Sequence, residues 1–130
     1  MDKRERLERI ILGTLLRDSD LEHYPSCKYC ITEEMFDSDI HKDIYALITN
    51  AVKFGGKSSL YDLFVLYPDK VSDLCPYIAN LTIFEDFEVK KMNYNEEQWL
   101  KSLTDGVTPN YSSVVFDDYV SEFIKCVFKP

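Results

Sequence analysis

The stretch from Phe36 to Leu63, FDSDIHKDIYALITNAVKFGGKSSLYDL, decides how this chain of 130 residues folds. Asp37 or Ser38 is placed to cap a helix at its start, and Gly55 to end that helix in a left-handed conformation. Ser59 is placed to cap a second, shorter helix three residues after the glycine pair. Apolar residues recur every three or four positions, which is typical of amphipathic helices. They are Ile40, Ile44, Leu47, Ile48, Ala51 and Val52 in the first helix and Leu60, Leu63, Phe64 and Leu66 in the second.

The same period predicts helices on both sides of this stretch. A first helix is expected over residues 4–17, and Thr32 is placed to start a single helical turn. Another helix is expected over 70–81, with Pro76 near a helix start or at a break between two short helices. The last helix is expected over 112–128, and its inner face is predicted to carry Val115, Tyr119, Phe123, Cys126 and Val127.

Residues 84–110 interrupt this pattern. They are acidic and irregular, with one expected helix at 95–104 and a short strand at Phe84–Val89 as an alternative. Five or six helices around one core is the simplest architecture for the rest. We therefore predict a single all-α domain over residues 1–130, a compact bundle in which 84–110 is an insertion.

The charge of the chain excludes several classes of function. The formal net charge is −8, with −3 in residues 1–65 and −5 in residues 66–130. Neither half offers the positive surface that nucleic acids require, so strong direct binding to nucleic acid is not expected.

No apolar run approaches the ~20 residues that cross a bilayer, and the N-terminus is unlike a secretory signal. We expect a cytoplasmic protein with reduced, mostly buried thiols and no contact with membranes.

One set of residues has the chemistry of a metal site. His23, Cys27, Cys30 and His41 are all types that bind zinc. Strong zinc motifs bring two closely spaced pairs of ligands, whereas His41 stands alone on a helix. The favoured interpretation is therefore two structural cysteines one turn apart and no bound metal, and a small zinc-binding regulatory protein is the alternative.

Catalytic motifs are not evident in the sequence. The segment Gly55–Ser58 ends in Gly-Lys-Ser, but it follows a helix, and Ala51 stands where a nucleotide-binding loop has its first glycine. A hydrolase that uses His41 and acidic residues is a further alternative. Helix caps and solvated faces explain the carboxylates, and we expect His41 to be a hydrogen-bonded packing residue. We expect neither an enzyme nor a cofactor.

With these residues in view, the chain resembles the N-terminal domain of DnaB-type replicative DNA helicases. Three ordered blocks and the start of the last helix carry the resemblance. The residues are Glu8, Ile11, Leu12, Gly13, Leu16 and Asp18; Phe36, His41, Ile44, Tyr45, Ile48, Gly55, Leu60 and Leu63; Tyr77, Ile78, Ala79 and Leu81; and Tyr119, Val120 and Glu122.

The resemblance implies an all-helical interaction domain without a catalytic site. In that family the domain forms the collar of a hexameric ring, pairs with copies of itself and touches primase or loader proteins. The family's ATPase lies in a separate RecA-like domain that this chain lacks, so the chain is a fragment of a helicase or a free-standing relative. The helicase-binding domain of a primase, which has a similar helical architecture, is a neighbouring alternative.

The family also has a helical hairpin that turns back at about the point where this chain ends. Without that hairpin, Tyr119, Phe123, Ile124 and Phe128 cannot all be buried against one face. We therefore predict that these four residues form a partner-binding surface. The alternative is that aromatic residues of 84–110 fold back and cover them. The expected function is protein–protein contact in DNA replication, through self-association or through a primase, helicase or loader partner.

Overall fold

Every regular element in the described part of the chain is a helix, and no strand occurs there. The structure is a computed structural model that describes residues 2–16, 21, 24–28, 30–78 and 113–128. In chain order the elements are α1 (Lys3–Leu16), α2 (Tyr24–Lys28), the 3₁₀ helix η1 (Glu33–Met35), α3 (Asp39–Gly55), α4 (Leu60–Leu66), α5 (Pro68–Ile78) and α7 (Ser113–Phe128). The all-α prediction is confirmed for these residues. The expected helix at 95–104 and the alternative strand at 84–89 lie outside them.

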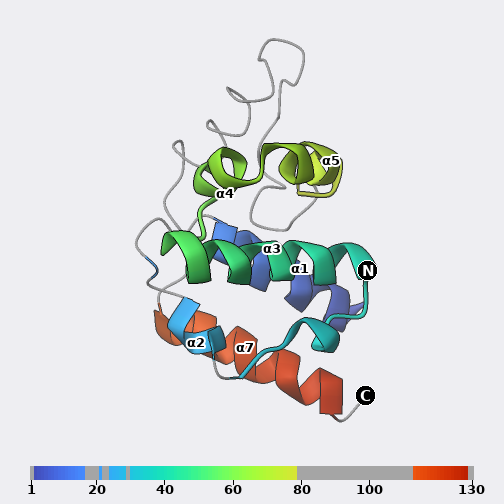
Figure 1. Cartoon of the computed structure of the whole chain (residues 1–130). Coiled ribbons are helices and arrows are strands. Elements are labelled where there is room, and N and C mark those ends of the chain that lie inside the picture. The colour runs from blue at the N-terminus through green and yellow to red at the C-terminus, as the bar shows by residue number, and fades with distance from the viewer. Residues whose placement is uncertain (1, 17–20, 22–23, 29, 79–112, 129–130) are drawn as a thin grey trace.

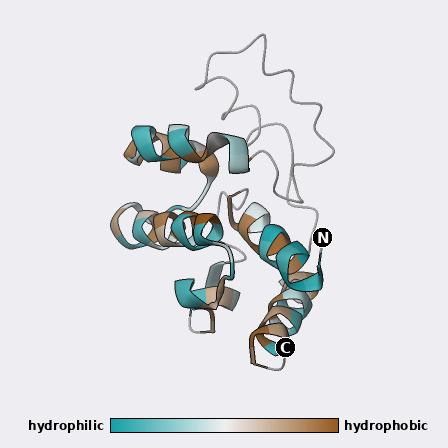
Figure 2. Cartoon of the chain, turned by 90° about the vertical axis from the view of Figure 1, so that its right-hand side faces the viewer, coloured by the Kyte–Doolittle hydropathy of each residue, from teal (hydrophilic) through white to brown (hydrophobic). Residues whose placement is uncertain are grey.

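Helix α3 lies in the middle of the arrangement. Figure 1 shows α4 and α5 on one side of α3, and α7 with α2 on the other. Helix α1 packs against both α3 and α7. In Figure 2, which shows the chain turned by 90°, α4 and α5 again lie above α3. None of the described helices is long and apolar enough to span a membrane.

The core is built around α1, whose residues are all buried from Ile10 to Leu16. Because neighbours surround this part of α1, its one polar side chain needs an internal partner, and the Thr14 hydroxyl donates to the Ile10 carbonyl at 2.7 Å. The Ser58 hydroxyl donates to the Leu15 carbonyl at 2.9 Å and thereby ties the loop before α4 to the end of α1. The Phe36 ring lies 5.0 Å from the Tyr45 ring and 5.1 Å from the Phe123 ring, measured between centroids, so it joins α3 to α7.

The start signals of the two central helices are confirmed, and the stop signal of the first is wrong by one residue. The Ser38 and Ser59 hydroxyls accept from backbone N–H groups in the first turns of α3 and α4. Gly56, with φ of 69°, adopts the left-handed conformation that we expected of Gly55. Gly55 is the last residue of α3, where an added Cβ would lie 2.9 Å from Leu66 Cδ1. The two glycines therefore serve different purposes, one a close approach and the other a positive φ.

Two further expectations need correction. Pro76 lies inside α5, two residues before its end, and not at a helix start or a break. This position removes one helical hydrogen bond in the last turn, where the helix is about to stop. In α7 the inward face is carried by Phe116, Val120 and Phe123, whereas Val115 is 41% exposed. The spacing of four and then three residues fits one helix face as well as the predicted set does, and the larger Phe116 side chain takes the buried position.

Candidate functional site

The structure separates the four residues that we predicted as a partner-binding surface. Phe123 is fully buried beside Phe36, so it cannot contact a partner in this fold. Tyr119 and Ile124 are half-buried and pack on the core. Only Phe128 is well exposed, at 71%. The predicted surface on α7 therefore narrows to the region around Phe128.

Three exposed apolar side chains occur where α3 and α4 end. Phe54 is 73% exposed, Val65 61% and Leu66 44%. The two helix ends lie side by side, because Leu66 Cδ1 reaches the position of a Cβ on Gly55, the residue after Phe54. We call these three residues the α3–α4 apolar patch. A contiguous group of exposed apolar side chains is a candidate contact surface for a partner.

Sequence reasoning did not single out this patch, although one signal was present. Phe54 follows the apolar stripe of α3 but does not belong to it, since the stripe continues from Ala51 to position 55. A large aromatic residue outside the buried stripe of an amphipathic helix is a candidate for exposure. Leu66, by contrast, was grouped with Leu60 and Leu63, which are buried, while Leu66 itself lies at the exposed helix end.

A buried polar cluster joins α1 to the start of α3. The Glu8 side chain is 1% exposed, and its Oε1 accepts from His41 Nδ1 at 2.7 Å. Its Oε2 accepts from the Asp37 backbone N–H at 3.0 Å and lies 3.5 Å from Arg4 Nε. Arg4 also donates from its Nη2 to the Met35 carbonyl at 2.6 Å. We call Arg4, Glu8 and His41 the Glu8 cluster.

Both oxygens of Glu8 are engaged by groups of the chain itself. One accepts from the His41 ring at the start of α3 and the other from the Asp37 backbone N–H, while Arg4, one turn earlier on α1, forms an ion pair with the carboxylate. His41 is buried and hydrogen-bonded through Nδ1, so the expectation that it is a hydrogen-bonded packing residue is confirmed.

The cysteines lie in different environments. Cys27 in α2 is buried and Cys126 in α7 is half-buried, whereas Cys30 is exposed, which corrects the expectation that the thiols are mostly buried. No group of three or more potential ligands in the described residues is placed to hold a metal ion. His23 lies outside these residues, so the structure does not place the full set of four candidate zinc ligands.

The Tyr45 hydroxyl lies in the core, where burial opposes its ionisation. Its hydroxyl donates to the Ile31 carbonyl at 3.1 Å, and only 2% of the residue is exposed. Burial raises the pKa of Tyr45 well above its usual value near 10, because the phenolate would lose its hydration.

Comparisons with models of protein families, with curated proteins and with solved structures find no match to this chain.

Proposed function

We propose that this chain is a non-catalytic protein–protein interaction domain of DNA replication, similar to the collar domain of DnaB-type helicases. Its partners are copies of itself or a primase, helicase or loader protein. The observation that carries the interaction role is the α3–α4 apolar patch, in which Phe54, Val65 and Leu66 are exposed at two adjoining helix ends. Covering such a patch with a partner would remove apolar area from water and favour association.

Some of the residues that carry the resemblance contact one another in the core. Glu8 of the first block binds His41 of the second, and Phe36 of the second block packs against Tyr45 of the same block. The buried Glu8–His41 pair and the contact between the Phe36 and Tyr45 rings explain why these residue types occur at these four positions. Glu8, His41, Phe36 and Tyr45 thus belong to the scaffold of the fold.

Self-association is tested by sedimentation velocity over a wide range of protein concentration. We expect assemblies larger than the monomer, or a complex when a purified DnaB-type helicase, its loader or its primase is added. A chain that stays monomeric and binds none of these proteins would refute the proposal.

A matched pair of variants then locates the surface. Phe54 and Phe128 are almost equally exposed, at 73% and 71%, but lie on different helices. If Phe54 is buried in the contact, Phe54→Ser removes about 2 kcal/mol of apolar burial, which is roughly a thirtyfold weaker association. Phe128→Ser should leave the association within about threefold of wild type. The opposite result would move the surface to the end of α7.

A further inference from the structure

An open groove lies between α3 and α5, outside the surfaces described above. It encloses about 360 Å³ and has an apolar floor and a polar rim. Leu47, which is buried, and the half-buried Leu74 form the floor. The rim carries Asp43 and Asn50 from α3 and Lys70 and Asp73 from α5, all of them exposed. A groove of this size accepts one or two side chains of a partner segment and is too small for a folded domain.

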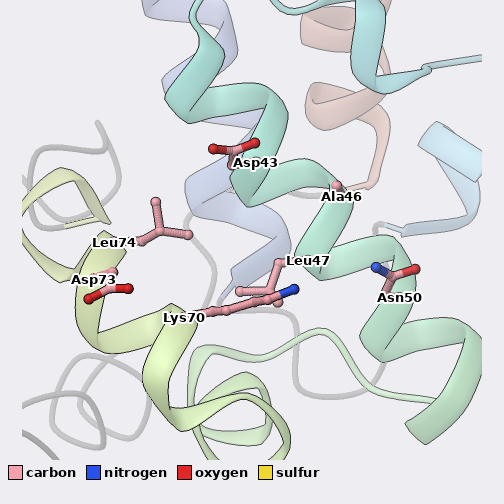
Figure 3. Close-up of a pocket in the computed structure, with 7 residues that line it drawn as sticks. All are labelled: Asp43, Ala46, Leu47, Asn50, Lys70, Asp73 and Leu74. Carbon is pink, nitrogen blue, oxygen red and sulfur yellow. The ribbon is translucent and has the colours of Figure 1, made fainter.

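The charges on the rim are arranged unevenly. Figure 3 shows Asp43 and Asp73 on opposite walls near Leu74, while the Lys70 side chain extends toward Asn50. Lys70 Nζ also lies 6.0 Å from the centroid of the Tyr67 ring. Asp43 and Asp73 form no ion pair with another residue in the described part of the chain. Among the described residues, the end of the groove near Leu74 therefore presents two carboxylates to a cation.

We propose that this groove binds a segment of a partner protein that presents an arginine or lysine beside a leucine-like side chain. The apolar side chain would lie on Leu47 and Leu74, and the cation would lie between Asp43 and Asp73. The net charge of −8 favours a basic protein segment as the occupant and disfavours nucleic acid. This inference rests on the proposed function, because it names one docking site and the chemistry of the segment that docks there.

The test uses the smallest probes that carry both side chains. These are N-acetyl-leucyl-arginine amide and N-acetyl-arginyl-leucine amide, titrated to tens of millimolar into ¹⁵N-labelled protein and observed by NMR. The control is N-acetyl-leucyl-glutamate amide. We expect one or both arginine probes to shift the amide signals of Leu47, Lys70 and Leu74, and the glutamate probe to leave them unchanged. Saturable shifts confined to another face, or no shifts with either arginine probe, would overturn the proposal.

Two variants with the same change in charge separate the groove from general attraction to an acidic protein. Asp43→Asn with Asp73→Asn should weaken binding of the arginine probe about tenfold. Glu34→Gln with Asp118→Asn, at exposed positions on η1 and α7, should change it less than threefold. Equal weakening in both variants would show that only the net charge matters and would overturn the proposal.

Sedimentation of the same variants distinguishes this inference from the proposed function. If the arginine probes bind in the groove but the chain stays monomeric and does not bind the replication proteins, the groove proposal holds and the proposed function is refuted. If the probes do not bind and the Asp43→Asn, Asp73→Asn variant loses self-association, the occupant is a second copy of the chain and the present proposal is wrong.

Discussion

The Glu8 cluster gives the sharpest prediction for stability. Glu8→Gln keeps the shape of the side chain but replaces one carboxylate oxygen by an NH₂ group. The amide can accept from His41 Nδ1–H or from the Asp37 N–H, but not from both in the present geometry. The substitution also removes the negative charge beside Arg4 Nε, a buried nitrogen with no hydrogen-bond partner in the described residues.

The magnitude follows from these losses. A hydrogen bond to a charged group contributes about 1.5–3 kcal/mol, and breaking a buried ion pair costs about 3–5 kcal/mol. Because the glutamine retains one of the two strong bonds, we expect the free energy of unfolding to fall by about 2–4 kcal/mol. This is a large fraction of the roughly 5–15 kcal/mol that stabilises a typical domain.

Urea unfolding followed by circular dichroism at 222 nm measures the loss. The control is Glu5→Gln, one turn earlier on α1, where the side chain is 44% exposed and pairs with Arg9 at 3.2 Å. That exposed pair is worth less than about 1 kcal/mol. A double-mutant cycle of Glu8→Gln with His41→Gln should give a coupling energy of about 1 kcal/mol or more. Equal effects of Glu8→Gln and Glu5→Gln would refute the view that the cluster is a buried link.

The remaining predictions concern the core and the turn after α3. Tyr45→Phe should cost about 1–2 kcal/mol near neutral pH, because the Ile31 carbonyl loses its donor; unfolding curves with an unchanged midpoint would contradict this. Since burial raises the folded-state pKa of Tyr45, its neutral form stabilises the fold below pH about 10, and that stability is lost as the pH rises further; stability measured across this range should fall less in the variant. Phe123→Ala should cost about 3–5 kcal/mol in urea unfolding and Phe128→Ala less than about 0.5 kcal/mol, and similar losses would show that Phe123 is not a core residue. Gly56→Ala should lower the thermal midpoint through a cost of about 1–2 kcal/mol at φ of 69°, and a neutral result would exclude the left-handed conformation.

Local chemistry made the helix starts predictable. A serine followed by an amphipathic stripe specifies a cap without knowledge of the rest of the fold, and Ser38 and Ser59 both occupy cap positions. Local chemistry did not decide which of the two glycines at the end of α3 takes the left-handed conformation. Gly55 and Gly56 both suit a helix end, and only the approach of Leu66 assigns them different purposes.

Local sequence also did not decide which residues of α7 face inward or where a groove forms between helices. Val115 and Phe116 can each begin an apolar stripe on α7, and packing against other helices selects Phe116. The groove between α3 and α5 depends on how two helices cross, which neither helix specifies in its own sequence. The exposure of Phe54 could have been foreseen from its place outside the stripe of α3, whereas the partner of Glu8 could not, because His41 lies 33 residues away.

The packing of α1 against α7 has a consequence for synthesis on the ribosome. Lys3 and Glu122 form an ion pair of 2.9 Å across 119 residues of sequence. Helix α1, whose residues Ile10–Leu16 are all buried in the folded chain, is therefore translated long before the helix that packs against it, and its apolar residues are open to chaperones or to neighbouring nascent chains in the meantime. Slow codons ahead of α7 should lower the soluble yield, while the same codons after α7 should have no effect.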